Sequence, residues 1–293
     1  MSIIQAIILS IVEGITEFLP ISSTAHLKFT NPLLGVTETP FSNMFEVVIQ
    51  LAAILSVVVV YWKRFINFKH ISFYLKLVVA VIPALVFGAL LKKHIDASLS
   101  NLTFIACVML GGGIILLFID SFFKTNNINE EEKISYPKAL VIGFFQVLSI
   151  LLPGLSRSAA TIIGGMSQKL TRNLAAEFSF FLAVPTMLAA SIKSFWDACR
   201  ENYLLQHGIT KEQAEGVHIK FGEILNGENL HTLFNHDNLI AIIIGGVVSF
   251  VVALIAVKFL ISYLQKHGFK AFGWYRIGLG ALMLVLIFTK VVA

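Results

Sequence analysis

Long apolar segments recur along the whole chain and limit what it can fold into. A helix needs about 20 apolar residues to cross a bilayer core of roughly 30 Å. Of the 293 residues, 57% are hydrophobic and 13% are charged, whereas a typical soluble domain has about 25% charged residues. Segments long enough to cross as helices lie at about 44–62, 73–91, 102–120, 174–194, 238–260 and 273–291. The sequence therefore predicts an all-α polytopic membrane protein with six transmembrane helices.

Two further apolar stretches, 3–29 and 138–166, differ from these spans. Each is interrupted near its middle by a proline, Pro20 or Pro153, followed by a serine-containing turn. Each half is too short to cross the bilayer. Irregular backbone at membrane depth is tolerated only where protein buries it or water reaches it. The pattern predicts two re-entrant helical hairpins.

The two hairpins are related in sequence. Placing EGITEFLPISST over QVLSILLPGLSR aligns Pro20 with Pro153 and Ser23 with Ser156. Each hairpin is followed by three spans, and three crossings bring the second copy in from the opposite side. The sequence thus predicts an inverted-topology repeat, an arrangement in which broken helices meet near the midplane. The expected copies, within one membrane domain of residues 1–293, are about 1–120 and 138–293.

The charges predict an orientation. Basic residues, among them Lys76 and Arg276, gather in the stretches 62–76, 124–172 and 258–276, whereas the 195–237 loop is mostly acidic. Because Lys and Arg are enriched in cytoplasmic loops, these stretches are expected inside and the 195–237 loop outside. The net charge of +5 is interpreted as reporting this orientation, and no nucleic-acid partner is expected.

Glu13 and Glu17 are two carboxylates within the first apolar stretch, where charged residues are costly and need an explanation. They are four apart, so both project from one face of a helix. Ionisable residues within a membrane are candidates for a functional site. Carboxylate oxygens also bind Mg²⁺ or Ca²⁺, so the pair is a predicted site for a divalent cation. The alternative is that both carboxylates lie on the water-exposed side of a helix at the membrane interface and have no functional role.

Hydroxyl groups and a histidine follow Pro20. Ser22, Ser23 and Thr24 can cap free backbone N–H groups at a helix start, and such N–H groups bind anions. Ser23 and His26 are three apart, and a serine near a histidine is the minimal activated-nucleophile pair. His26 alone could also transfer a proton. The alternative is that these residues only cap the helix.

The second hairpin contains Arg157, flanked by Ser156, Ser158 and Thr161. A guanidinium presents a fork that matches two phosphate oxygens, which predicts a phosphate clamp. The alternative is a structural counter-ion to the carboxylates of the first hairpin. If the two hairpins meet, the combined site suits a phosphorylated ligand with a divalent cation. Glu46 and Gln50 either extend this site or form a solvated helix end.

EGITEFLPISSTAH together with LLPGLSRSAAT closely resembles the undecaprenyl pyrophosphate phosphatase family, also called bacitracin-resistance proteins, over essentially the whole chain. The resemblance implies an enzyme of the bacterial inner (plasma) membrane. It implies hydrolysis of undecaprenyl pyrophosphate to undecaprenyl phosphate, which recycles the lipid carrier of peptidoglycan synthesis. It also implies a site open to the extracytoplasmic side, in contact with membrane lipid.

Motif matching assigns expected roles by position. The expected catalytic residues are Glu17, Ser23, His26 and Arg157. The expected substrate-binding residues are Ser22, Thr24, Ser156, Ser158 and Thr161, and the expected metal ligands are Glu13 and Glu17. Ala25 departs from the family, which often has glycine there. The nucleophile stays open between Ser23, which we favour, and a water activated by Glu17 or His26. An inverted-repeat transporter of an anionic substrate is the alternative function, and a homodimer is left open.

Overall fold

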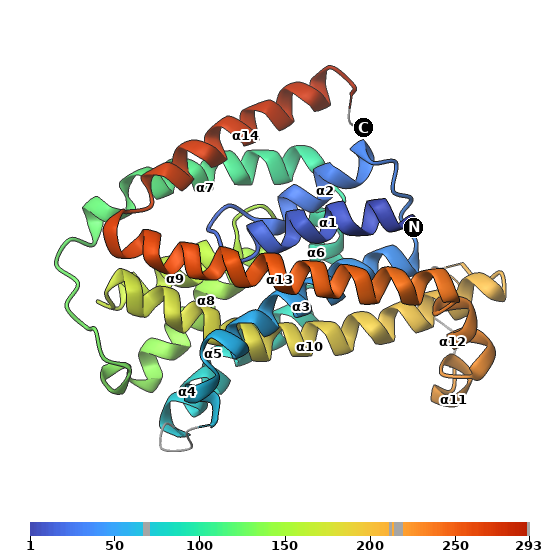
Figure 1. Cartoon of the computed structure of the whole chain (residues 1–293), viewed down its shortest axis with the longest axis horizontal. Coiled ribbons are helices and arrows are strands. Elements are labelled where there is room, and N and C mark those ends of the chain that lie inside the picture. Colours follow the sequence, from blue (N-terminus) through green and yellow to red (C-terminus); the bar gives the residue numbers. More distant parts are fainter. Residues whose placement is uncertain (67–70, 211–212, 214–218, 292–293) are drawn as a thin grey trace.

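The long helices run along the longest axis of the molecule (Figure 1). The computed structural model describes residues 1–66, 71–210, 213 and 219–291. Within these residues, six helices are long and apolar enough to cross a membrane, which confirms the six predicted spans. They are α3 (Pro40–Val60), α5 (Ile71–Leu90), α7 (Leu102–Phe122), α10 (Arg172–Gln206), α13 (His236–Lys266) and α14 (Lys270–Phe288).

Two shorter pairs of helices occupy the stretches with a central proline. α1 (Ile3–Thr16) is followed by α2 (Ser23–Leu33), and α8 (Tyr136–Leu151) is followed by α9 (Arg157–Ser167). Because proline has no N–H to donate, the first helix of each pair ends before it. We call residues 17–22 the first tip and residues 152–156 the second tip.

Each tip ends on a serine with an unusual backbone. Ser22 (φ 72°) and Ser156 (φ 76°) both have positive φ. Their hydroxyls accept hydrogen bonds from the backbone N–H groups of Ala25, at 3.3 Å, and Ala159, at 3.2 Å. These bonds satisfy donors that would otherwise be free at the start of a helix. Ser22 and Ser156 are therefore the equivalent positions of the two tips.

This equivalence differs by one residue from the predicted pairing of Ser23 with Ser156. The second tip has one more residue between its proline and its capping serine than the first tip has. In consequence, Ser23 and Arg157 are each the first residue of the helix that follows.

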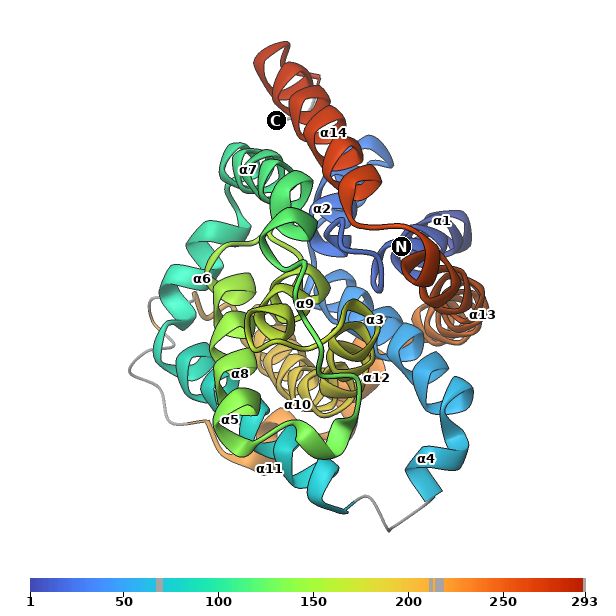
Figure 2. The same ribbon diagram turned by 90° about the vertical axis from the view of Figure 1, so that its left-hand side faces the viewer.

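Close contacts between helices hold the two pairs in the bundle. α1 packs on α13 at Gly14, where an added Cβ would meet the Ser249 carbonyl oxygen at 2.8 Å. α8 packs on α5 at Gly143, where an added Cβ would overlap the backbone of Ala80. α3 packs against both α10 and α13. Figure 2, a view along the bundle, shows α7 and α14 side by side at its edge.

The 195–237 segment, which the charge pattern places outside, begins as helix. α10 continues to Gln206, and Cys199 is buried on this helix. Residues 211–212 and 214–218 of this segment lie outside the described residues. The remaining short helices are α4 (Trp62–Ile66), α6 (Lys92–Leu99), η2 (Glu131–Lys133, a 3₁₀ turn), α11 (Phe221–Ile224) and α12 (Gly227–Leu233).

Two basic residues that the sequence analysis counted with the cytoplasmic stretches are buried. Lys76 lies in α5 and donates to the backbone carbonyls of Glu131, at 3.3 Å, and Glu132, at 3.4 Å. Arg276 lies in α14 and is 0% exposed. A basic side chain that is buried in the protein does not indicate on which side of the membrane a loop lies. The predicted orientation must therefore depend on the other basic residues.

Candidate active site

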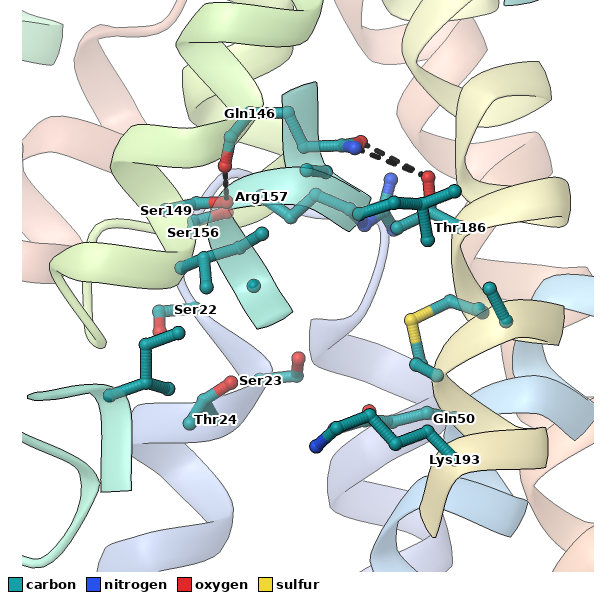
Figure 3. A pocket seen from close by; sticks show the side chains of 18 of the residues that line it. Ser22, Ser23, Thr24, Gln50, Gln146, Ser149, Ser156, Arg157, Thr186 and Lys193 are labelled. Carbon is teal, nitrogen blue, oxygen red and sulfur yellow. Dashed lines mark hydrogen bonds between the residues drawn. The ribbon is translucent and has the colours of Figure 1, made fainter. Parts of the chain in front are cut away.

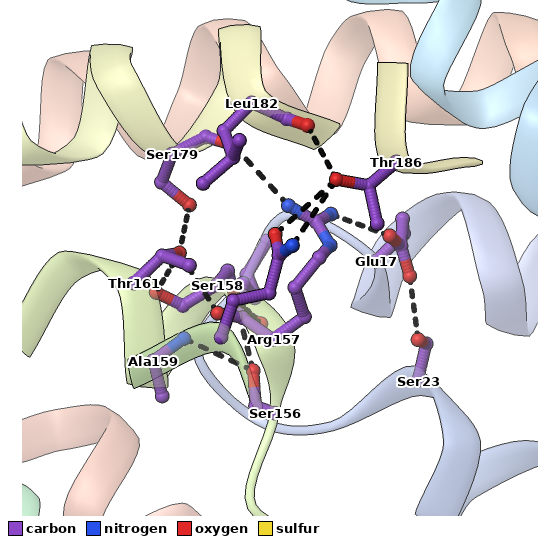
Figure 4. A network of polar contacts seen from close by, with 12 residues as sticks. Glu17, Ser23, Ser156, Arg157, Ser158, Ala159, Thr161, Ser179, Leu182 and Thr186 are labelled. Atoms are coloured by element: carbon purple, nitrogen blue, oxygen red, sulfur yellow. Dashed lines mark hydrogen bonds and ion pairs between the residues drawn. The ribbon is translucent and has the colours of Figure 1, made fainter. Parts of the chain in front are cut away.

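The first tip contacts the start of α9 inside the bundle (Figure 4). The Ser158 hydroxyl, at the start of α9, donates to the Leu19 carbonyl of the first tip at 3.1 Å. Arg157, beside it, reaches Glu17 across the same contact. The fold thus joins residues about 140 positions apart in the sequence, and it brings the two predicted groups of polar side chains to one place.

Glu17 is the centre of this contact. One carboxylate oxygen, Oε1, accepts a hydrogen bond from Arg157 Nη2 at 2.6 Å. The other, Oε2, accepts one from Ser23 Oγ at 2.6 Å. Glu17 and Ser23 are both largely buried. The Ser23 hydroxyl proton therefore points at a carboxylate, which is the geometry of a nucleophile paired with a general base.

Arg157 keeps capacity for a ligand. Nη1 donates to the Ser179 carbonyl of α10 at 3.3 Å, and Nη2 donates to Glu17. Within the described residues these contacts occupy two of the five guanidinium N–H donors. Arg157 also begins α9, and the free N–H groups of a helix start favour anions. Phosphate oxygens could therefore bind both the side chain and the helix start.

A cavity of about 370 Å³ opens beside these groups (Figure 3). The predicted site residues that line it are Glu17, Ser22, Ser23, Thr24, Ser156 and Arg157. Its apolar wall comes from α5, α8 and α10, and includes Ala84, Leu85, Gly88, Ile150, Met187 and Ala190. A polar end beside an apolar wall suits an amphiphilic ligand with an anionic head group.

Ser158 and Thr161 lie behind the wall of the cavity. Both are buried. Ser158 holds the first tip through Leu19, and the Thr161 hydroxyl lies 2.6 Å from the Ser179 hydroxyl of α10. In this structure the two residues hold the start of α9, which carries Arg157, and neither lines the cavity.

His26 also lies away from the cavity lining. Its Nδ1 is 2.7 Å from the Ser22 carbonyl oxygen and its Nε2 is 2.8 Å from the Tyr275 hydroxyl of α14. The two rings are stacked, with centroids 5.7 Å apart. Because both ring nitrogens have partners, His26 ties the first tip to α14.

Glu13 is 0% exposed, and neither of its carboxylate oxygens is hydrogen-bonded to a described residue. It lies one helical turn before Glu17, whose backbone N–H donates to the Glu13 carbonyl at 2.9 Å. A buried carboxylate without a donor needs a proton or a cation. Either would satisfy Glu13, and in the second case the carboxylate would be a ligand of the cation.

The described residues do not include three or more His, Cys, Asp or Glu side chains grouped as a metal site. A divalent cation beside Glu13 and Glu17 would need further oxygens from phosphate and water. Mg²⁺ is commonly bound in this way, through one or two carboxylates plus substrate phosphates.

The two residues of α3 considered as an extension of the site have separate positions. Gln50 lines the cavity. Glu46 instead accepts a hydrogen bond from Asn31 Nδ2 of α2 at 2.5 Å.

Several lining or supporting residues were not identified from the sequence. Gln146 of α8 donates to Thr186 of α10 at 3.2 Å, and both line the cavity. At the mouth, Lys193 and Lys92 both contact Asp197, at 3.2 and 3.1 Å. Gln146 and Thr186 are isolated polar residues within apolar segments, a signal that could have identified them.

Helices long enough to cross a membrane thus surround a cavity that has polar and charged side chains at one end and an apolar wall. This combination is typical of an integral membrane protein whose ligand is an amphiphilic anion. Comparison with known protein families is more specific than this class. The chain belongs to the bacitracin resistance protein family (BacA), whose sequence model matches residues 6–282.

Individual relatives match over nearly their full length. The chain is 48% identical to the undecaprenyl-diphosphatase of Flavobacterium psychrophilum and 46% identical to that of Flavobacterium johnsoniae, in each case over 98% of this chain and 97% of the relative. It is 42% identical to the undecaprenyl-diphosphatase of Porphyromonas gingivalis over 99% of both chains. The resemblance noted from the two motifs is confirmed.

Proposed function

We propose that the protein hydrolyses undecaprenyl pyrophosphate to undecaprenyl phosphate and inorganic phosphate, and so recycles the lipid carrier of cell-wall synthesis. Family membership and the relatives named undecaprenyl-diphosphatase support this function. The observation that carries it is Glu17, which contacts the Ser23 hydroxyl and the Arg157 guanidinium at 2.6 Å each.

These contacts suggest a sequence of steps. Ser23 Oγ attacks the terminal phosphorus while Glu17 takes the hydroxyl proton. The bond from that phosphorus to the bridging oxygen breaks, and undecaprenyl phosphate leaves. Water then hydrolyses the phosphoserine and releases inorganic phosphate. Arg157 stabilises the negative charge on the transferred group, which is the main task of a protein in phosphoryl transfer.

A water activated by Glu17 is the alternative nucleophile, with Ser23 only holding phosphate. We favour Glu17 over His26 as the base in either case, because both ring nitrogens of His26 have protein partners.

Other residues of the cavity would bind the remainder of the substrate. Ser22, Thr24 and Ser156 line the same cavity as Arg157, where their hydroxyls and the starts of α2 and α9 can bind phosphate oxygens. The apolar wall from α5 and α10 would accept the first part of the prenyl chain. Ser158 and Thr161 would act by holding this end of the cavity in shape.

We propose that Glu13 and Glu17 hold a divalent cation, Mg²⁺ or Ca²⁺, together with substrate phosphate. The support is the buried Glu13 carboxylate, which has no hydrogen bond to a described residue. The cation would balance the charge of two neighbouring carboxylates beside a pyrophosphate.

We also propose that α1–α2 and α8–α9 are re-entrant hairpins of an inverted repeat in the bacterial inner membrane, with the site facing the extracytoplasmic side. Contact between the first tip and the start of α9 supports this arrangement. The two helix pairs also lie toward opposite ends of the long axis in Figure 1.

The test is phosphate release from undecaprenyl pyrophosphate by the purified protein in detergent. The wild type should release inorganic phosphate, and Ser23→Ala should release far less while keeping its thermal midpoint. A well-folded wild type that releases no phosphate would refute the proposed hydrolysis and favour the alternative function, a transporter that binds an anion without cleaving it.

A further inference from the structure

Arg276 is the largest fully buried side chain of the described residues, and it sits between both tips. Nη1 donates to the Pro20 carbonyl of the first tip at 3.1 Å. Nη1 and Nη2 also donate to two carbonyls of the second tip, at Leu155 (2.6 Å) and Gly154 (2.8 Å). Nε donates to the Met109 carbonyl of α7 at 3.2 Å. One guanidinium therefore binds three separate segments of the chain.

These bonds are specific to the relative position of the tips. A buried charge is costly unless its hydrogen bonds are satisfied, and the hydrogen bonds of Arg276 to described residues go to backbone carbonyls. If the tips separated or slid, the hydrogen bonds between the guanidinium and the carbonyls would break. The fork geometry of arginine suits this task, and a lysine ammonium does not reproduce it.

The tip carbonyls are close in sequence to the reacting groups. Pro20 precedes Ser23 by three residues, and Leu155 precedes Arg157 by two. A shift of one tip against the other would therefore move Arg157 relative to Glu17 and Ser23, and Arg157 contacts Glu17 at 2.6 Å.

The space around the guanidinium is filled. An added Cβ at Gly112 of α7 would overlap Arg276 Nη2. Gly154 has a φ of 99°, and an added Cβ there would meet the Ile105 carbonyl oxygen at 2.5 Å. The neighbouring Tyr275 adds a second tie to the first tip through His26. α14 thus holds both tips through consecutive residues.

We propose that Arg276 is a positioning residue, which fixes the two tips in the register that aligns Ser23, Glu17 and Arg157. The proposal depends on the proposed phosphatase function, and it adds a residue that does not line the cavity. Because small misplacement of reacting groups can cost about 10²-fold in rate, disturbing this contact should lower turnover more than substrate binding.

The experiment compares Arg276→Lys, Gly112→Ala and the control Gly111→Ala with the wild type. Gly112→Ala displaces the guanidinium while keeping the arginine. Gly111 lies on the same helix, and an added Cβ there meets nothing within 4 Å. The measurements are kcat and KM for phosphate release per folded protein, the thermal midpoint, and backbone amide exchange of residues 19–25, 152–159 and α13.

We expect kcat to fall between about 10-fold and 10²-fold in Arg276→Lys and Gly112→Ala, with KM within about threefold. Amide exchange should accelerate in both tips and not in α13. Gly111→Ala should match the wild type in every measurement.

Wild-type kcat and unchanged tip exchange in Arg276→Lys and Gly112→Ala would overturn the proposal. If Arg276→Lys does not fold, Gly112→Ala decides by the same criteria. Failure of both to fold would assign Arg276 to stability and also overturn a positioning role. If the wild type releases no phosphate, the proposed function fails, and the exchange of the tips still decides whether Arg276 holds them.

Discussion

Glu17 is shared between a hydroxyl and a guanidinium, and this sharing limits what can replace each neighbour. Its two oxygens face different partners, Ser23 and Arg157. Arg157 must therefore serve two functions. It balances a buried carboxylate, and it keeps donors directed toward the cavity.

Replacing Arg157 separates these two functions. Arg157→Lys keeps the positive charge beside Glu17 and loses the fork. We expect turnover to fall by roughly 10²–10³-fold with little change in thermal midpoint. Arg157→Ala should lose turnover and also lower the midpoint, because it leaves a buried carboxylate unpaired. Near-normal phosphate release by Arg157→Lys would show that Arg157 is only a counter-ion.

Glu13 predicts a dependence on divalent cations. Chelator should abolish phosphate release, and Mg²⁺ or Ca²⁺ should restore it. Glu13→Gln removes one charge with little change of shape, so the variant should fold normally and need a higher cation concentration for half-maximal activity. Undiminished activity in excess chelator would rule out an exchangeable cation.

Part of this candidate site could be singled out from the sequence, and the roles of its residues stay predictions. Glu17, Ser23 and Arg157 were identified because charged and hydroxyl residues are conspicuous in apolar segments. The direction of His26 could not be predicted, because its partner Tyr275 lies 249 positions later and depends on how α14 packs. The same is true of Arg276, which the sequence analysis counted with the basic stretch 258–276, because its partners Pro20, Gly154 and Leu155 are more than 100 positions away.

The two tips are the elements that carry the site, and their backbone is strained at equivalent positions. For a residue with a side chain, left-handed backbone costs roughly 1–2 kcal/mol. At Ser22 and Ser156 the cap that each hydroxyl provides for the next helix offsets part of this cost. Proline spacing predicted where each hairpin breaks. It could not predict that the second tip has one more residue between its proline and its capping serine, because this spacing depends on the partner against which each tip packs.

Substitution at Ser156 should show this strain. Ser156→Gly removes the positive-φ penalty and loses a few tenths of a kcal/mol of capping, whereas Ser156→Ala loses about 1 kcal/mol of capping and keeps the penalty. The thermal midpoint of Ser156→Gly should equal or exceed that of the wild type, and Ser156→Ala should fall below it.

The control for this comparison is Ser135, which caps α8 with an ordinary φ of −82°. There, glycine relieves no strain, so Ser135→Gly should lie slightly below the wild type. A midpoint for Ser156→Gly as low as that for Ser156→Ala would contradict the strain argument.

At the scale of the whole molecule, the remaining question is which end of the bundle faces outward. The two chain ends and α12 lie toward one end of the long axis, and α4 lies toward the other (Figure 1). The six spans could be predicted because apolar length alone identifies them. The orientation was inferred from loop charges, and two of the counted cations, Lys76 and Arg276, are buried. The orientation therefore depends on exposed residues such as Lys63 of α4.

Cysteine labelling tests this orientation directly. In a background with Cys107 and Cys199 replaced by alanine, Lys63→Cys and Glu228→Cys place one exposed thiol near each end of the bundle. An impermeant maleimide should label Glu228→Cys in intact spheroplasts, and Lys63→Cys only after permeabilisation. The reason is that Lys63 and Arg64 lie beside the end of α3, and basic residues are retained on the cytoplasmic side. The reverse pattern would place the cavity mouth, with Lys92 and Lys193, on the cytoplasmic side, and would remove the proposed access of substrate from outside.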